Sequence, residues 1–212
     1  MKALIIQGGW EDHEPATTSR LFSDALEQHG FKVHIADKLT ALDDLEKLRS
    51  YQLIVPNWTM GEPTPEQIEN LTKAIHSGTN LGGFHGGMGD AFRGCTEYEW
   101  MVGGHFVGHP HVGEYTVDVI DQDHPITKGM PEHFVYDSEQ YYLLVDPIVQ
   151  ILVETDYYYE GQSLKMPIVW TKNWGKGRVF YSALGHQAVE FENYPAVFDM
   201  TVRGLVWAAG TI

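Results

Sequence analysis

The segment from Leu81 to Gly89, which reads LGGFHGGMG, most strongly constrains how this chain folds. Its first half is typical of a buried strand, and the glycines on both sides of His85 predict a sharp turn directly after that strand. In many hydrolases a turn of the form G-x-nucleophile-x-G presents a Ser or Cys at the end of a central strand. Here the tip is a histidine, so we do not expect simple acyl transfer. A histidine that only donates to the backbone is the simpler alternative, but glycines that relieve steric strain favour a functional turn.

The N-terminal half alternates short apolar runs with helical patterns. Strands are expected at residues 3–6, 31–36, 53–55 and 80–84, and helices at residues 16–28, 42–48 and 63–77. This alternation predicts an α/β fold with a doubly wound, mostly parallel sheet and right-handed crossovers. Ligands of such sheets bind at the carboxyl ends of the strands. We therefore expect one crevice lined by Gly9, Trp10, Trp58 and His85, which follow three different strands.

The C-terminal half has a different pattern. Strands are expected at residues 112–120 and 148–155, and residues 167–170 with 177–182 predict a β-hairpin near the C-terminus. A last helix is expected at residues 194–209. Because no linker, repeat or low-complexity segment interrupts the sequence, we expect a single domain, 1–212.

Charge and cysteine content narrow the class of protein. The net charge of -15 argues against a nucleic-acid partner, since a phosphate backbone is bound by clustered Lys and Arg. Cys95 is the single cysteine, which excludes an intrachain disulfide and favours a reducing, cytoplasmic location. No apolar run is long enough to span a membrane, and nothing indicates a nucleotide or a flavin cofactor. The sequence leaves a homo-oligomer open.

Residues 103–111, GGHFVGHPH, place three histidines within seven residues. Imidazole is a common metal ligand, and short His-rich tracts suit Zn²⁺ or a related divalent ion. On an extended chain His109 and His111 would share one face, and His105 would join them. The spacing matches no zinc-finger pattern, so a polar loop that lines a pocket is the alternative.

Further candidate residues lie in the C-terminal half and directly after the first strand. Asp137 and Glu139 are two residues apart, so on an extended chain their carboxylates point the same way and could exchange protons, bind sugar hydroxyls or ligate a metal. A solvated surface pair is the alternative. His186 comes shortly after the last strand, where the histidine of hydrolase triads also falls. His13 follows the first strand and could enter the same crevice.

Several segments together resemble the ThuA-like (trehalose utilisation) family, which has the class I glutamine amidotransferase-like fold. The resemblance covers nearly the whole chain and rests on the order and spacing of short motifs. These motifs are Gly8-Gly9 with His13, Gly83-Phe84-His85-Gly86, Gly104-His105-Phe106 with His109-Pro110, His124-Pro125-Ile126, Asp137-Ser138-Glu139-Gln140-Tyr141, Pro167-Ile168-Val169-Trp170, and Gly175-Lys176-Gly177-Arg178-Val179-Phe180-Tyr181 with Gly185-His186. The resemblance implies a flavodoxin-like sheet whose turn lacks the amidotransferase cysteine.

The resemblance also implies a role in bacterial carbohydrate catabolism, on a disaccharide or its 3-keto derivative. We expect an enzyme for isomerisation or cleavage next to a carbonyl group, which needs a base and an electrophile. The residues expected at the site are His85, Glu139 and His186 for catalysis, Gly9, Trp10, His13, Trp58, Asp137 and Tyr141 for the small carbohydrate ligand, and His105, His109 and His186 for a divalent metal, Zn²⁺ or similar.

Two other functions stay open at this point. A non-catalytic sugar-binding or regulatory protein could keep this scaffold after loss of the nucleophile, since function resides in the site and not in the fold. A glutaminase would require Cys95, ten residues after His85, as its nucleophile.

Overall fold

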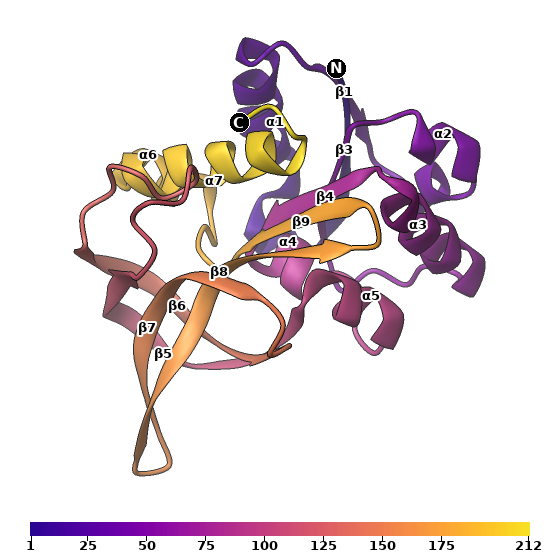
Figure 1. Ribbon diagram of the computed structural model, residues 1–212. Coiled ribbons are helices and arrows are strands. Elements are labelled where there is room, and N and C mark those ends of the chain that lie inside the picture. The colour runs from indigo at the N-terminus through magenta and orange to yellow at the C-terminus, as the bar shows by residue number, and fades with distance from the viewer.

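A computed structural model describes all residues, 1–212, and contains one sheet of nine strands in the order β2-β1-β3-β4-β9-β8-β7-β5-β6 (Figure 1). The strands are β1 (Lys2–Gly9), β2 (Lys32–Ala36), β3 (Leu53–Thr59), β4 (Asn80–Phe84), β5 (Gly104–Val119), β6 (His133–Val145), β7 (Gln150–Tyr159), β8 (Gln162–Trp174) and β9 (Gly177–Ser182).

Seven α-helices and two short 3₁₀ helices connect these strands. They are η1 (Glu11–His13), α1 (Pro15–Gln28), η2 (Leu39–Leu42), α2 (Leu45–Arg49), α3 (Pro65–Ser77), α4 (His85–Gly89), α5 (Thr96–Val102), α6 (Ala188–Asn193) and α7 (Pro195–Ala208). The expected helix at residues 42–48 is in fact split into η2 and α2, because Asp44 accepts the Lys47 N–H and begins a new helix there.

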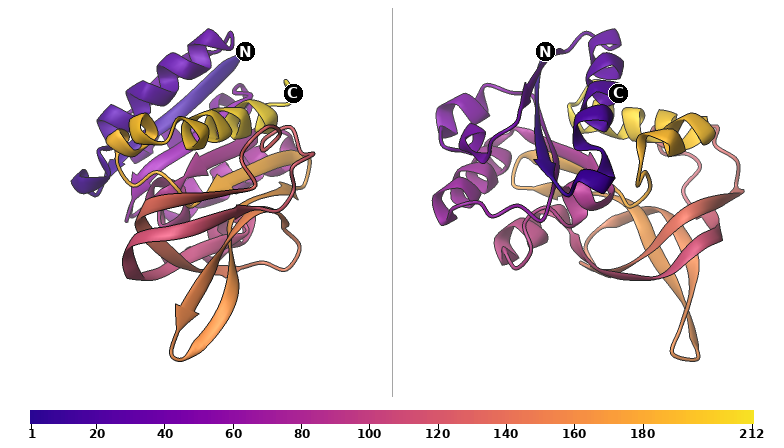
Figure 2. Two further views of the ribbon diagram at one scale, coloured as in Figure 1. Left: turned by 90° about the vertical axis from the view of Figure 1, so that its left-hand side faces the viewer. Right: turned by 180° about the vertical axis from the view of Figure 1, so that it is seen from behind.

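The parallel half of the sheet consists of β2, β1, β3, β4 and β9. Apart from the edge strand β2, these strands are mostly buried, as expected for strands covered by helices on both faces. Helices α1 and α7 lie on one face, and α2, α3 and α5 lie on the other (Figures 1 and 2). The register pairs Phe84 with Ser182, so the carboxyl ends of β4 and β9 lie side by side.

The other half of the sheet is antiparallel, so the sheet is mixed and not mostly parallel as expected. Strands β9, β8, β7, β5 and β6 pair antiparallel with one another in this order. The physical reason is that no helix separates β5 to β9 along the chain, so these strands lack the helical crossover that usually joins parallel strands. Figure 2 shows these strands projecting away from the parallel half and from both termini.

The long strand β5 begins earlier than the sequence indicates and includes the whole histidine tract. Its pairing with β6 has register shifts between Phe106 and Gly108 and between Gly108 and His111. Such bulges place extra residues opposite one partner and turn side chains in new directions. The expected alternation of faces therefore fails across the tract.

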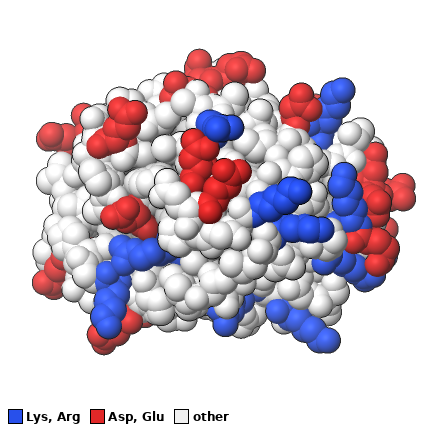
Figure 3. Space-filling view, turned by 90° about the horizontal axis from the view of Figure 1, so that it is seen from above, with Lys and Arg blue, Asp and Glu red and all other residues white.

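Charged side chains are spread over the surface. On the face seen from above, acidic and basic side chains are interspersed, and no continuous basic area covers that face (Figure 3). Several of them form exposed pairs, such as Arg20 with Asp24 at 3.0 Å. None of the helices has the length and apolar character needed to cross a membrane.

Candidate metal centre

His85 lies at the first residue of α4, directly after β4, with a φ angle of 44°. This left-handed conformation is uncommon for a residue with a side chain and marks a strained turn. The glycines beside it are required by close packing. A Cβ on Gly86 would lie 2.5 Å from the His13 ring, and one on Gly87 would lie 2.5 Å from the Asn57 side-chain oxygen.

The tautomer of His85 follows from its backbone partner. Its Nδ1 lies 2.9 Å from the carbonyl oxygen of Ala183, which can only accept, so Nδ1 carries the proton. In the neutral form of the ring the lone pair is at Nε2. Tyr141 places its hydroxyl 2.7 Å from that nitrogen. The His85 side chain is 2 % exposed.

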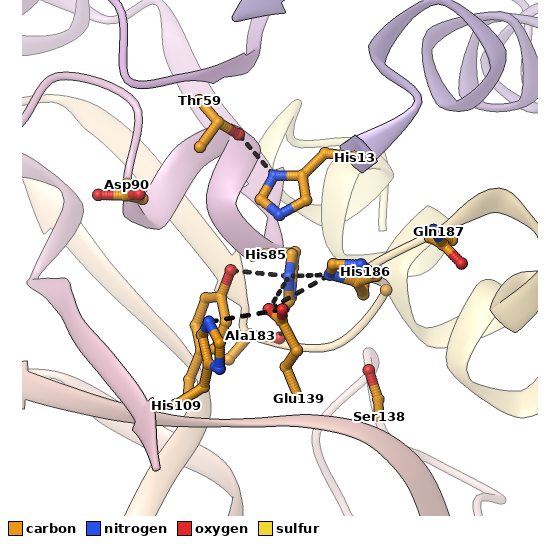
Figure 4. Close-up of polar contacts among 12 residues, drawn as sticks. His13, Thr59, His85, Asp90, His109, Ser138, Glu139, Ala183, His186 and Gln187 are labelled. Carbon is orange, nitrogen blue, oxygen red and sulfur yellow. Dashed lines mark hydrogen bonds and ion pairs between the residues drawn. The ribbon is translucent and has the colours of Figure 1, made fainter. Parts of the chain in front are cut away.

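Three ligand atoms from separate parts of the chain form a nearly equilateral triangle (Figure 4). The Nε2 of His85 lies 3.2 Å from Oε2 of Glu139 on β6 and 3.2 Å from Nδ1 of His186, which follows β9. The third side, from His186 Nδ1 to Glu139 Oε2, is also 3.2 Å. Ligands of a tetrahedral Zn²⁺ at 2.0–2.1 Å lie about 3.3 Å from each other, so the triangle has the size of one face of such a site.

His13 on η1 lies beside this triangle. Its Nδ1 forms a hydrogen bond with the Thr59 hydroxyl at 2.7 Å, which leaves Nε2 free. One ligand atom from each of His13, His85, Glu139 and His186 lies within 4.8 Å of all the others. In both His13 and His85, Nδ1 forms a hydrogen bond and Nε2 faces the group. A hydrogen bond at the second ring nitrogen is typical of metal-ligating histidines, because it fixes the ring orientation.

Burial and the mutual contacts of the group shift the pKa values of three of its members. Burial would raise the pKa of Glu139, but hydrogen bonds from His186 and His85 outweigh it and hold the pKa well below its usual range. Burial lowers the pKa of His186, but the hydrogen bond and the charge of Glu139 outweigh burial and raise it. Burial and the neighbouring His85 and His186 lower the pKa of His13 to about 3, so its ring is neutral at pH 7.

A cavity of about 550 Å³ opens in front of the triangle. Asp90 and Arg93 form a bidentate ion pair on its wall, with distances of 2.6 and 2.7 Å, and Arg93 lies over the ring of Phe106. The residues that line the cavity are Trp10, Asp12, His13, Thr59, Met60, Asp90, Arg93, Phe106, His109, Glu139, Tyr141, His186 and Gln187.

The family model for ThuA, described as trehalose utilisation, matches residues 2–208 of this chain. The chain belongs to the ThuA family. No curated protein matches it in a sequence search. The motifs that carried the resemblance in the sequence therefore identified the family correctly, and the expected carbohydrate-catabolism setting rests on this membership.

Several solved structures share the fold. A putative ThuA-like protein from Parabacteroides merdae is 20% identical, with a TM-score of 0.77 over 99% of this chain and 90% of the other. One from Bacteroides uniformis is 22% identical, with a TM-score of 0.79 over 98% and 91%. A cytoplasmic protein from Salmonella typhimurium is 12% identical, with a TM-score of 0.65 over 98% and 99%.

The structure brings together most of the residues that the sequence singles out in this ThuA-family chain. His85, Glu139 and His186 form the triangle, and His13 lies with them instead of only lining the cavity. Trp10 and Tyr141 line the cavity. Gly9 lines an adjoining groove with Trp10.

The expected metal set of His105, His109 and His186 is not the set that the structure assembles. His105 turns toward Glu99, with Nδ1 3.6 Å from Oε2, and lines other surface hollows. The bulges of β5 separate it from His109, which does line the cavity and has its Nε2 3.5 Å from Glu139 Oε1. His111, the third histidine of the tract, contacts the backbone oxygen of Glu114.

Three further expectations about the site are corrected. The Trp58 ring packs against Gly8 and Gly61 and does not line the cavity. Asp137 is exposed and lies outside the cavity, so Glu139 is the carboxylate that reaches the site. Cys95 also lies outside it, and burial raises the pKa of its thiol, which argues against a glutaminase nucleophile.

Sequence reasoning missed the Asp90–Arg93 pair and Glu190. Asp90 and Arg93 are three residues apart just after the glycine turn, a spacing at which opposite charges pair, and this signal was available. Glu190 is only 9% exposed, yet it lies in a short helix that no apolar periodicity predicts. Its side-chain partners, Tyr136 and Ser138, are distant in the sequence, so only the structure identifies it.

Proposed function

We propose that this chain is an enzyme of carbohydrate catabolism that acts on a disaccharide or its 3-keto derivative, by isomerisation or by cleavage next to the carbonyl group. Membership of the ThuA family supports the substrate class. The observation that carries the proposal is the triangle of His85, Glu139 and His186 at a cavity whose volume lies in the range of small-molecule sites. We place the protein in the cytoplasm, as its Salmonella relative is described.

The same triangle is proposed to hold one divalent metal ion, Zn²⁺ or a similar ion, with His13 as the fourth ligand. Imidazole nitrogens and a carboxylate oxygen are ligands that Zn²⁺ takes. The 3.2 Å distances between the three atoms match the spacing of ligands around a tetrahedral Zn²⁺. When bound, such an ion supplies a Lewis acid that polarises a substrate carbonyl group.

Proton transfer at the carbon next to the carbonyl is assigned to His109. With His85, His186 and His13 facing one another, His109 is the remaining imidazole on the cavity wall. Its side chain is 41% exposed, so it can contact a substrate, and Glu139 Oε1 lies 3.5 Å from its Nε2 and orients it. The bulge that carries it re-aims the side chain, as bulges next to active sites do. Imidazole suits this role because it exchanges protons near neutral pH.

The charge of the cavity wall favours an uncharged ligand. Arg93 is its single Lys or Arg, and both carboxylate oxygens of Asp90 already pair with one edge of that guanidinium, at Nε and Nη2. Asp12 and Glu139 add negative charge. A sugar phosphate or sugar acid would therefore meet no free cation in the wall, whereas an unphosphorylated sugar can stack on Trp10 and donate hydroxyls to Asp90.

The test is turnover of a 3-keto-disaccharide, followed by NMR in D₂O, before and after removal of metal by a chelator. The proposal expects conversion that is lost on chelation, is restored by Zn²⁺ or another divalent ion, and is absent in His85→Gln. For isomerisation, deuterium should enter the carbon next to the carbonyl group, and His109→Gln should slow that exchange. Absence of turnover with every 3-keto-disaccharide, together with saturable sugar binding, would overturn the enzyme and favour a sugar-binding protein.

A further inference from the structure

We propose that Glu190 is the positioning residue of this centre: its buried carboxylate fixes the two chain segments that carry Glu139 and His186. This inference rests on the proposed metal centre. Glu190 lies on α6 and is not among the residues that line the cavity, so it contacts neither substrate nor metal. It acts through the backbone and side chains on which the ligands are mounted.

On one side, Glu190 holds the loop that carries His186. Its Oε2 accepts the backbone N–H of His186 at 3.0 Å. The same oxygen accepts the hydroxyl of Tyr136, which in turn accepts the N–H of Gly185 at 3.1 Å. The backbone N–H of His186 is thus bound to Glu190 directly, and that of Gly185 is bound to it through the Tyr136 hydroxyl. The close approach needs glycine, because Gly185 has a φ of 97° and a Cβ there would lie 2.1 Å from Phe191 of α6.

On the other side, Glu190 holds the strand that carries Glu139. Its Oε1 accepts the hydroxyl of Ser138 at 2.9 Å, and Tyr136 belongs to the same strand, β6. Side chains alternate along a strand, so Tyr136 and Ser138 point to the face opposite Glu139. The contacts of Glu190 with Tyr136 and Ser138 fix that face of β6, so the side chain of Glu139 on the other face is directed at His85 and His186. One carboxylate therefore sets the 3.2 Å distance between Glu139 Oε2 and His186 Nδ1.

The chemistry of the contacts predicts a graded effect of substitution. Glu190 accepts three donors with two oxygens, and the N–H of His186 cannot be turned into an acceptor. Gln offers one acceptor oxygen, so it keeps the His186 contact only if Ser138 rotates to accept from the new amide. Ala removes every contact and leaves buried polar groups without partners. Loss of outer-shell partners typically costs about 10–100-fold in metal affinity.

The experiment compares Zn²⁺ affinity, by competition with a chromophoric chelator, in the unsubstituted protein, Glu190→Gln, Glu190→Ala and Glu192→Gln. Glu192 is exposed on the same helix and serves as the matched control. We expect affinity to fall about 10-fold for Gln and about 100-fold for Ala, within the range for outer-shell partners, and to stay unchanged for the control. Absorption of bound Co²⁺ should lose intensity in both Glu190 variants as the tetrahedral geometry relaxes.

The outcomes separate the two claims. Absence of Zn²⁺ binding by the unsubstituted protein would overturn the metal centre and the role of Glu190 with it. Tight binding by the unsubstituted protein, with the same affinity and the same Co²⁺ spectrum in folded Glu190→Gln, would overturn the role of Glu190 alone. Circular dichroism of the metal-free proteins establishes folding, and Glu190→Gln decides the matter if Glu190→Ala does not fold.

Discussion

The Nε2 of His85 lies 3.2 Å from the Nδ1 of His186, although 101 positions separate the two residues in the chain. The reason is the parallel pairing of β4 with β9, which ends at Phe84 and Ser182. The segments that leave two adjacent parallel strands emerge at the same edge of the sheet. When both nitrogens are unprotonated they repel each other, so the pair is suited to sharing a proton or a cation.

Substitution of single histidines should separate the observed ligand set from the set expected from the sequence. His85→Gln removes one corner of the triangle and should reduce Zn²⁺ affinity by more than about 100-fold, beyond the loss typical of outer-shell partners. His105→Gln should leave affinity within about twofold, because His105 faces Glu99. Titration with a chelator measures both. A large loss of Zn²⁺ affinity in His105→Gln would indicate that the histidines of residues 103–111 ligate the metal after all.

The two carboxylates of β6 should differ in the same assay. Glu139→Gln removes the negative ligand and should weaken Zn²⁺ binding by at least about 100-fold. Asp137→Asn is the matched control, because Asp137 lies two residues earlier on the same strand but is exposed and outside the cavity. Equal losses in both variants would indicate a general charge effect and contradict the site.

Gly86, the residue after His85, should control the position of the His13 ring. In Gly86→Ala the new methyl group would lie 2.5 Å from the His13 ring, so the ring must move. We expect Zn²⁺ affinity to fall about 10-fold while the protein stays folded. Gly108→Ala is the control, since the nearest atom to its Cβ is 4.0 Å away, on Pro110. Unchanged affinity in Gly86→Ala would show that His13 is not a ligand.

Metal-free protein should lose stability as the pH falls from 6.5, in part through His13. Its pKa is lowered from 6.5 to about 3 by burial and by His85 and His186. The unfolded chain therefore binds a proton between these pH values that the folded chain does not, and this destabilises the folded state. Above pH 6.5 His13 has no such effect.

Two neighbours of His13 must be considered in the same measurement. Glu139, whose pKa is lowered, contributes stability above its usual range that is lost in acid, and His186, whose pKa is raised, contributes stability below pH 6.5 that is lost as the pH rises. Urea unfolding in EDTA at pH 7 and pH 5 should show a smaller loss in His13→Gln than in the unsubstituted protein. An equal or larger loss in the variant would contradict the burial of a neutral His13.

The sequence predicted the strands of the parallel half, although β1 and β3 run on to Gly9 and Thr59, beyond their expected ends. His85 and His186 were found because each follows a strand whose apolar run is clear, and Glu139 was found because an extended chain would place its carboxylate on the same face as that of Asp137. These are local signals, and the rule that ligands bind at the carboxyl edge of such a sheet converts them into one site.

The parts that could not be predicted depend on register and on distant contacts. Two bulges in β5 interrupt the alternation of side chains that was expected to place His105 and His109 on one face. No residue type in residues 103–111 predicts a bulge. Trp58 was expected to follow a strand, but it lies within β3, and its ring fills the space left by Gly8 and Gly61. The contacts of Glu190 with Tyr136 and Ser138 span more than fifty residues, which no local pattern indicates.

The most direct test of the central claim is X-ray absorption at the zinc edge, on protein loaded with one equivalent of Zn²⁺. The metal centre predicts four nitrogen or oxygen ligands at about 2.0–2.1 Å, with multiple scattering from imidazole that decreases in His85→Gln. A zinc ion bound to sulfur at about 2.3 Å, which only Cys95 or methionine could supply, or a spectrum unchanged in His85→Gln, would contradict it.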